Sequence, residues 1–246
     1  MCHICNERPR SDTITLARRR FLKLAGNAAL GLTTIRSGFA AAPKAPPKPE
    51  NVVSPDAALD RLMNGNRRYV EGVAKRHDFR HEREALTKGQ NPFAGVLSCA
   101  DSRVAPEYAF DAGRGDLFVC RVAGNLINDD VIASFEYGVS VLNTPLILVL
   151  GHQACGAVDA AIKSIKDSTT LPGHLPSLVT ALTPAVKAAL GQPGNSLDNA
   201  IRQNVVLTVA GIKTATPILS QAVEDKKVRV VGAVYDLADG RVALVN

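Results

Sequence analysis

Two cysteines and a histidine occur in two short segments, one of which also carries an acid and a base. Cys99 opens the run Cys-Ala-Asp-Ser-Arg at 99–103, and His152 precedes Cys155 by three residues. Two thiolates and an imidazole form a donor set that suits zinc. Three protein ligands leave the fourth tetrahedral position open, as in catalytic rather than structural zinc sites. These residue types predict a catalytic site with one zinc ion per chain.

Asp101 and Arg103 lie two residues apart in the first of these segments. They can pair with each other, which would keep the carboxylate ionised and fix its direction. The alternative is an ordinary loop salt bridge beside two buried thiols. A disulfide between Cys99 and Cys155 is a further alternative in an oxidising compartment.

The segments with these residues follow strands in the predicted secondary structure. Short apolar runs at 93–98, 117–122, 146–150 and 228–235 alternate with helical patterns. Such alternation predicts parallel strands joined by helices, hence an α/β fold with a mainly parallel sheet flanked by helices. In open parallel sheets, functional groups gather beyond the carboxyl ends of strands. We therefore expect Cys99 and His152 at the same edge of one sheet.

Helical patterns surround these strands. Ser54 is a candidate N-cap for a helix that reaches about Gly72, and Asn128 is a candidate N-cap for a helix over 129–142. Further helices are predicted at 157–166, 178–190, 197–211 and 218–226.

The first 42 residues have the layout of a signal peptide. Arg18, Arg19 and Arg20 precede a mildly apolar stretch at 24–39, and three alanines follow at 40–42. Paired arginines predict export by the twin-arginine route, to the periplasm. A retained amphipathic helix is the alternative. Residues 43–54 are predicted to be a proline-rich linker, and residues 55–246 one folded domain.

The basic character of the chain is concentrated in the predicted signal peptide. The whole chain has a formal charge of +6, but residues 1–42 contain seven Lys or Arg and two acids, which leaves 22 basic and 21 acidic residues in 43–246. A nearly neutral domain gives no support to a nucleic-acid partner. After residue 42, no stretch approaches the roughly 20 apolar residues that span a bilayer, so no membrane span is expected in the mature chain.

Two blocks of sequence resemble the signature motifs of the β-class carbonic anhydrases. They are Ser-Cys-Ala-Asp-Ser-Arg-Val-Ala-Pro-Glu at 98–107 and Gly-His-Gln-Ala-Cys-Gly-Ala-Val at 151–158, and the resemblance extends over 55–246. It implies that Cys99, His152 and Cys155 hold the zinc ion. Zinc hydroxide would then attack carbon dioxide and form bicarbonate, with Asp101, oriented by Arg103, accepting a hydrogen bond from the hydroxide.

The same resemblance implies further substrate contacts and an assembly. The amide of Gln90 and the backbone N–H of Gly156 would donate to substrate oxygens. Phe118 and Tyr137 would line the pocket for carbon dioxide, although core packing explains both equally well. Cys120 departs from the family pattern and is interpreted as a small buried hydrophobic residue. Members of the family form dimers or multiples of dimers, so we expect at least a homodimer.

Two other functions stay open at this stage. Related enzymes hydrolyse carbon disulfide or carbonyl sulfide, and pocket access would separate that activity from hydration of carbon dioxide. A protein that stores zinc or senses redox state, by cycling Cys99 and Cys155 between metal and disulfide, is the third hypothesis. The Asp101–Arg103 pair argues against it, because metal storage needs no oriented carboxylate.

Overall fold

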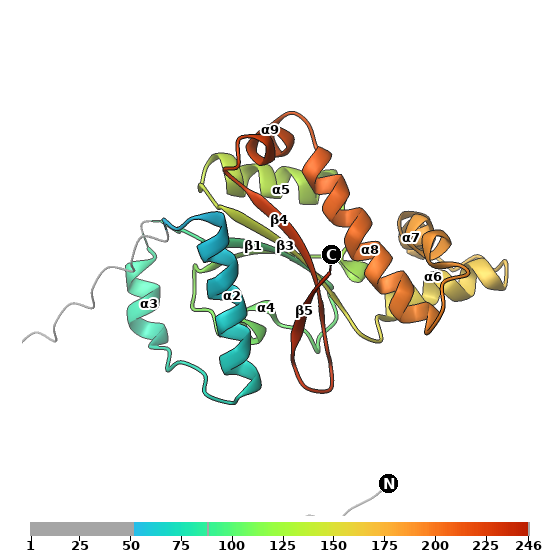
Figure 1. The fold of residues 1–246 in the computed structure, drawn as a ribbon, viewed down its shortest axis with the longest axis horizontal. Helices are drawn as coiled ribbons and strands as arrows, with labels where there is room; N and C mark the ends of the chain where they lie inside the picture. Colours follow the sequence, from blue (N-terminus) through green and yellow to red (C-terminus); the bar gives the residue numbers. More distant parts are fainter. Residues whose placement is uncertain (1–51, 88, 246) are drawn as a thin grey trace, which may run out of the picture. The chain divides into compact units, whose positions relative to one another are not determined.

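A five-stranded sheet lies at the centre of the computed structural model, which describes residues 52–87 and 89–245 (Figure 1). The strands are β1 (Ala94–Ser98), β2 (Leu117–Arg121), β3 (Leu146–His152), β4 (Arg229–Tyr235) and β5 (Val242–Val245). Their order in the sheet is β2-β1-β3-β4-β5. The first four are parallel, which confirms the predicted mainly parallel sheet, and β5 pairs antiparallel with β4. Strand β5 was not predicted, because four residues are too short a run to show a period.

The helices are α2 (Pro55–Val70), α3 (Phe79–Ala85), α4 (Pro106–Ala109), α5 (Asp129–Ser140), α6 (Gly156–Lys166), α7 (Leu175–Ala189), α8 (Ser196–Thr214) and α9 (Ile218–Glu224), with a short 3₁₀ turn, η1, at Ala123–Asn125. Both predicted N-caps are present. The Ser54 hydroxyl accepts from the N–H of Ala57, and the Asn128 side chain accepts from the N–H of Val131. Each cap satisfies a backbone donor that the first helical turn leaves without a partner.

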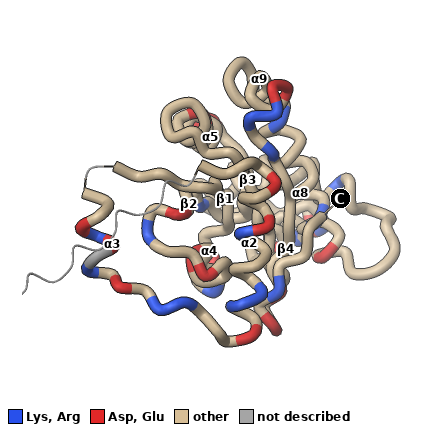
Figure 2. Tube along the Cα trace, turned by 60° about the vertical axis from the view of Figure 1, so that its left-hand side comes forward, with Lys and Arg blue, Asp and Glu red and all other residues tan. Residues whose placement is uncertain are grey.

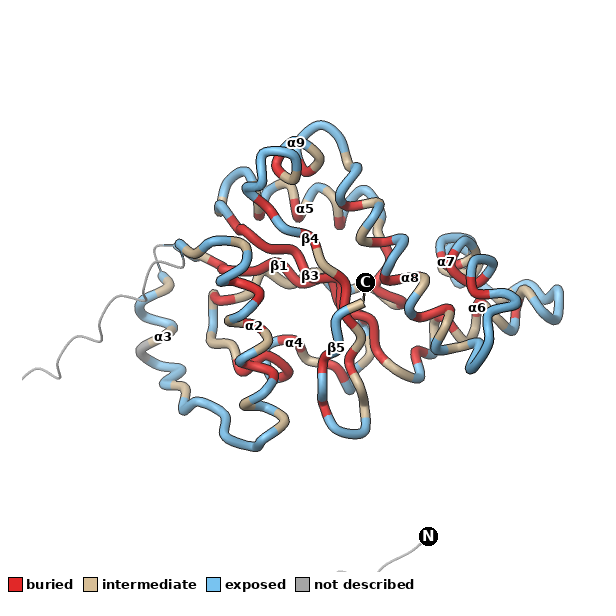
Figure 3. Tube along the Cα trace, viewed as in Figure 1, coloured by how far each residue is buried: buried red, intermediate tan, exposed pale blue. Residues whose placement is uncertain are grey.

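Helices cover both faces of the sheet. Successive strand residues point to opposite faces, so both faces carry apolar side chains that helices bury. On one face, Val96, Leu148 and Ala233 pack against residues of α2 and α4. On the other face, Leu97 and Val149 pack against residues of α5, α8 and α9. Figure 3 shows the central strands largely buried and the outward faces of the helices exposed. The sheet is therefore enclosed between two layers of helix.

A third apolar cluster lies beyond the carboxyl ends of β1 and β3. Residues of α6, α7 and α8 form it, together with Leu126 and both Cys99 and Cys155. The two cysteines are thus enclosed by apolar side chains rather than placed on an open loop. Burial of this kind keeps water away from the sulfur atoms and strengthens electrostatic interactions around them.

The structure extends β3 two residues beyond the predicted end at Leu150. Gly151 pairs with Val234, and His152 pairs with Tyr235. The N–H of Gln153 then donates to the carbonyl of Tyr235 at 3.0 Å. Because β4 continues alongside, its backbone groups keep β3 extended where the sequence of β3 alone indicated a loop. His152 is accordingly held by a strand.

Predictions for residues 1–42 and for residues 43–51 of the linker lie outside the described residues. Along the described chain, basic and acidic residues are interspersed (Figure 2). Within that part, no single helix has the length and apolar character needed to cross a membrane. One bent pair of helices, α8 with α9, meets the length and composition test.

Candidate metal centre

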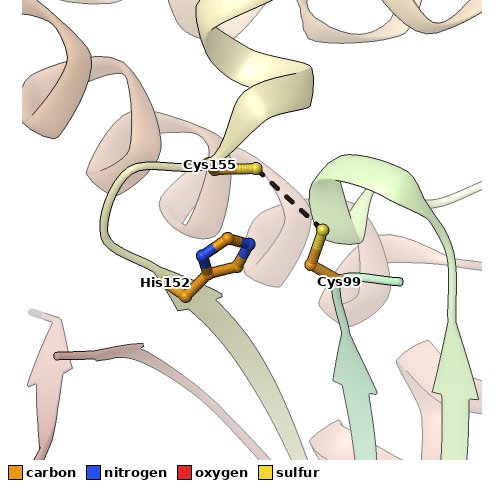
Figure 4. A group of neighbouring side chains, drawn as sticks. All are labelled: Cys99, His152 and Cys155. Atoms are coloured by element: carbon orange, nitrogen blue, oxygen red, sulfur yellow. Dashed lines mark hydrogen bonds between the residues drawn. The ribbon is translucent and has the colours of Figure 1, made fainter. Parts of the chain in front are cut away.

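Three side chains meet at the carboxyl edge of the sheet. Cys99 directly follows β1, His152 ends β3, and Cys155 precedes the first residue of α6. Their ligand atoms all lie within 4.8 Å of one another, and the three residues are buried. In Figure 4, the imidazole ring and the two sulfur atoms face one another. The structure thus brings together the three predicted ligands, which are 53 and 3 positions apart in the sequence.

Strand register explains why the two distant segments meet. β1 and β3 are parallel neighbours, with Ser98 opposite Leu150, so both chains leave the sheet at the same edge. Between His152 and Cys155 the chain turns sharply at Ala154, whose φ of 50° lies in the left-handed region. Such a conformation is unfavourable for alanine and persists only where the surrounding structure imposes it. The turn directs Cys155 back toward Cys99.

The donor atoms fit a zinc ion. Nδ1 of His152 lies 2.8 Å from the carbonyl oxygen of Gln153, which makes Nδ1 the protonated nitrogen and leaves Nε2 with a lone pair. Nε2 is buried and has no hydrogen-bond partner among the described residues. A buried polar atom without a partner is costly, and an imidazole nitrogen that faces two thiols is satisfied by a soft or borderline metal.

The two thiols do not form a disulfide. Sγ of Cys99 and Sγ of Cys155 are 4.0 Å apart, about twice the length of an S–S bond. The contact between the two sulfur atoms lowers the pKa of Cys99 against the effect of burial, and the His152 side chain and the N–H of Gly124 lower it further. The same contact, together with burial, raises the pKa of Cys155. The two thiols thus affect each other's ionisation, and a bound cation would stabilise both thiolates.

Helix α6 also faces the sulfur of Cys155. The backbone N–H groups of Ala157 and Val158, in the first turn, lie where they lower the pKa of Cys155 and oppose the effects of burial. The N–H groups of a helix N-terminus favour negative charge. Gly156, predicted to contact substrate, is the first residue of this helix and is exposed beside the cluster.

Asp101 and Arg103 form the predicted pair with a two-point geometry. Nε of Arg103 donates to Oδ1 at 2.9 Å, and Nη2 donates to Oδ2 at 2.7 Å. These bonds hold the pKa of Asp101 far below its usual range. Nη2 also donates to the carbonyl of Ala154 at 3.2 Å, which ties the two loops together. Oδ2 of Asp101 lies 3.8 Å from Nε2 of His152, so an ionised, oriented carboxylate stands next to the candidate ligands.

Arg121, at the end of β2, holds the main chain of the same loop. Its Nε donates to the carbonyl of Cys99 at 3.0 Å, and its Nη2 donates to the carbonyl of Asp101 at 2.7 Å. This residue was not among the predicted site residues. A basic side chain at the end of a neighbouring predicted strand was the available signal, but it becomes informative only once Arg121 is known to lie opposite Ser98.

Phe118 and Tyr137 lie together at the β2 edge of the sheet. Their ring centroids are 6.3 Å apart, Phe118 is half-buried, and Tyr137 is 48% exposed. Phe118 precedes the carboxyl end of β2 by three residues. Within one chain the two rings therefore lie back along the edge strand rather than in the group formed by the three candidate ligands.

Gln90 and Cys99 lie at opposite ends of β1. It is exposed in the segment before β1, whereas Cys99 follows the strand. Five strand residues span about 17 Å, which separates the Gln90 backbone from the candidate ligands of its own chain. A role for Gln90 in substrate binding stays a prediction.

Cys120 is a half-buried residue of β2, opposite Leu97, and packs with the apolar cluster under α5. Burial raises the pKa of its thiol, which keeps it neutral. A neutral, partly enclosed thiol agrees with the interpretation of Cys120 as a small hydrophobic residue.

Comparisons with known proteins agree on one family. The sequence profile of the family described as carbonic anhydrase matches residues 94–242. The chain is 40% identical over 192 residues to carbonic anhydrase 2 of Mycobacterium tuberculosis, covering 78% of this chain and 93% of that protein. A carbonic anhydrase of Mycolicibacterium smegmatis matches over the same length with the same identity.

Solved structures give the same result. The β-carbonic anhydrase CcaA superimposes with a TM-score of 0.60 at 27% identity, over 76% of this chain and 95% of that chain. A Coccomyxa β-carbonic anhydrase in complex with acetazolamide gives a TM-score of 0.60 at 26% identity, over 76% of this chain and 86% of that one. Together with the buried Cys-His-Cys cluster, these matches identify the chain as a member of the carbonic anhydrase family, in its β class.

Proposed function

We propose that this protein catalyses the reversible hydration of carbon dioxide to bicarbonate and a proton, with one zinc ion held by Cys99, His152 and Cys155. The buried Nε2 of His152, which lacks a hydrogen-bond partner and faces two thiol sulfurs beside Asp101, is the observation that carries this proposal. Membership of the carbonic anhydrase family supports the same reaction.

A zinc ion held by these residues would lower the pKa of a bound water to about 7 and so supply hydroxide at neutral pH. Asp101 would accept a hydrogen bond from that hydroxide, because its carboxylate is ionised and adjoins the candidate ligands. An acceptor on the hydroxyl proton turns the oxygen lone pair toward the carbon of carbon dioxide. Arg103 keeps the acceptor in this direction by binding both carboxylate oxygens.

The first turn of α6 is suited to the charge that develops on the substrate. As oxygen adds to carbon dioxide, negative charge moves onto the substrate oxygens, and the backbone N–H of Gly156 stands beside Cys155 at an exposed helix N-terminus. A preorganised N–H donor stabilises such charge without reorganisation. We assign Gly156 to substrate binding on this basis.

We further propose that two copies of the chain associate through the β2 edge. An edge strand exposes unpaired backbone groups, and here it adjoins an apolar surface formed by Phe118, Tyr137 and Val141, of which the last two are 48% and 56% exposed. A second copy would cover this surface and enclose Phe118 and Tyr137 near the site, and Gln90 could then reach the partner's substrate. Fungal β-carbonic anhydrases of Sordaria macrospora are described as tetrameric.

Sedimentation velocity of the wild type and of Tyr137→Glu tests the dimer. The wild type should sediment as a dimer or a multiple of dimers. The glutamate variant should shift toward monomer, because it places a charge in a desolvated contact. A wild-type protein that is monomeric at micromolar concentration would contradict the proposed association.

Export by the twin-arginine route is also proposed, on the basis of the Arg18-Arg19-Arg20-Phe21 sequence followed by a weakly apolar stretch. Such a route carries folded proteins, so zinc could stabilise the thiolates before they reach an oxidising periplasm. Fractionation of cells that express the full chain should place it in the periplasm. Replacement of Arg18, Arg19 and Arg20 by lysine should retain it in the cytoplasm, and unchanged export of that variant would argue against the route.

The decisive experiment is stopped-flow hydration of carbon dioxide by the purified full chain, with zinc measured on the same sample. The wild type should contain about one zinc per chain and be active, and Asp101→Ala should keep the metal but lose most of the activity. A zinc-loaded wild type that is inactive between pH 7 and 9 would exclude the proposed reaction. Carbon disulfide and carbonyl sulfide would then be the substrates to test, although the relatives named carbonic anhydrase favour carbon dioxide.

A further inference from the structure

A buried amide from helix α8 contacts the turn that follows β2. Asn204 is 4% exposed, and its Nδ2 donates to the carbonyl of Gly124 at 2.7 Å, across 80 residues of sequence. The N–H of Gly124 in turn donates to Sγ of Cys99 at 3.3 Å. Gly124 therefore makes two hydrogen bonds. Its carbonyl accepts from α8, and its N–H donates to a candidate zinc ligand.

The turn at Gly124 depends on a conformation that few residues tolerate. Gly124 has φ of 77° and ψ of 13°, and Asn125 follows with φ of 42°. A Cβ on Gly124 would lie 3.1 Å from Cδ1 of Leu182, so both backbone and space favour glycine here. Glycine adopts many other backbone conformations at little cost, so contacts with neighbours must hold this one.

Loss of the Asn204 amide would release this turn. The Gly124 carbonyl would then be buried without that donor, which costs free energy and favours rotation toward another partner. Rotation about the two backbone bonds of Gly124 changes the direction of its N–H relative to Sγ of Cys99. The hydrogen bond to sulfur is therefore coupled to the hydrogen bond from α8, although the two involve different peptide groups.

We propose that Asn204 is a positioning residue for the metal centre, which acts through Gly124 to keep an N–H directed at the Cys99 thiolate. The role assigned to Asn204 rests on the proposed zinc function and deepens it. An N–H bond to sulfur draws electron density from the thiolate and reduces its donation to the metal. Interactions that orient a ligand in this way change metal affinity or activity by about 10- to 100-fold when they are removed.

The test compares Asn204→Leu with Asn66→Leu in the full-length protein. Asn66 is a matched control. It is 5% exposed, and its Nδ2 donates to the carbonyls of Ala109 and Gly240. Neither of these residues is a predicted zinc ligand. Each protein is loaded with cobalt(II), and its thiolate-to-cobalt charge-transfer band is recorded. Zinc-loaded samples are then mixed with a chelator to measure the rate of metal loss.

We expect Asn204→Leu to shift the charge-transfer band to lower energy, because the thiolate becomes richer in electrons. We also expect zinc loss at least about tenfold faster than in the wild type, because loss of the fixed position of Cys99 outweighs the stronger donation of its thiolate. Asn66→Leu should lose stability but keep the wild-type band and rate. If Asn204→Leu keeps both the wild-type band and the wild-type rate, Asn204 is a structural residue only, and the proposed role is wrong.

A measurement on the wild type avoids dependence on the folding of a variant. In protein loaded with ¹¹³Cd, the Gly124 amide proton should show scalar coupling to the metal across its hydrogen bond to Cys99. Absence of that coupling, with the Gly124 amide assigned, overturns the proposal. If the coupling is present and Asn204→Leu changes the band and the rate as expected, but carbon dioxide is not hydrated, the proposed function fails and the role of Asn204 stands. If the wild type is active and the coupling is absent, only the role of Asn204 fails.

Discussion

Replacing Gly151 by alanine should disturb the metal centre. The added methyl group would point toward α8, which packs against β3 at this position. A Cβ on Gly151 would lie 2.7 Å from Cγ2 of Val205 and 3.4 Å from Cγ2 of Ile201. Carbon atoms pack at about 3.5 Å or more, so the new methyl group is about 0.8 Å too close to Val205. Since Gly151 precedes His152, the displacement reaches a candidate ligand directly.

The expected magnitudes follow from burial. Overpacking of a well-packed core costs about 1–3 kcal/mol, and we expect a value in this range for Gly151→Ala. Val205 is fully buried, and Val205→Ala should cost about 2–3 kcal/mol in lost transfer free energy and cavity formation. The double variant places the added methyl group in the space that Val205 vacates. It should therefore be more stable than the sum of the two single effects predicts, by about 1–2 kcal/mol.

Urea unfolding of the wild type, both single variants and the double variant measures this coupling, with zinc content and hydration activity determined for each. Gly151→Ala should have weaker zinc binding than the wild type, and the double variant should recover part of it. Free energies of unfolding that simply add would refute the claim that Val205 of α8 occupies the space beside Gly151. A Gly151→Ala variant with wild-type stability would refute it as well.

Three other predictions concern the site and the surrounding fold. Cys155→Ser should fall well below one zinc per chain by metal analysis and lose hydration activity, because serine is a poor ligand for zinc. Arg103→Lys should keep its zinc but lower kcat/KM by about tenfold or more in stopped-flow assays, since a lysine cannot make the two parallel bonds; activity within threefold of wild type would contradict this. Burial tends to raise the pKa of Asp111, but the hydrogen bonds from Arg68 and from the N–H of Lys75 outweigh it and leave the pKa lowered. The stability that this carboxylate adds is thus present above about pH 4 and lost as pH falls through its folded pKa, so the difference in unfolding free energy between wild type and Asp111→Asn should shrink below pH 4.

Much of the arrangement around the metal centre was predictable because its signals are local. Apolar runs marked the four parallel strands within one or two residues at most ends. Ser54 and Asn128 capped the helices that they were predicted to cap, since a cap acts on N–H groups two or three residues away. Parallel topology then placed Cys99 and His152 at one edge, because strands that run in the same direction end on the same side.

Other features depend on contacts between segments that no local pattern connects. The length of β3 was set by its pairing with β4, and the antiparallel β5 by its pairing with the same strand. Residues at the β2 edge and Gln90 lie apart from the metal centre within one chain, although the sequence resemblance groups them all in one site. Matching sequence motifs do not show whether the residues of a site come from one chain or from two.

The sequence alone determined which side chains could bind zinc, and that Asp101 and Arg103 could pair, because these properties follow from residue type and short spacing. Tertiary structure decided what holds those side chains in place. Arg121 reaches the Cys99 loop across 22 residues, and Asn204 reaches Gly124 across 80. Such contacts depend on strand register and on how α8 packs against the sheet, and these are set by the close packing of the whole core rather than by any neighbouring residue.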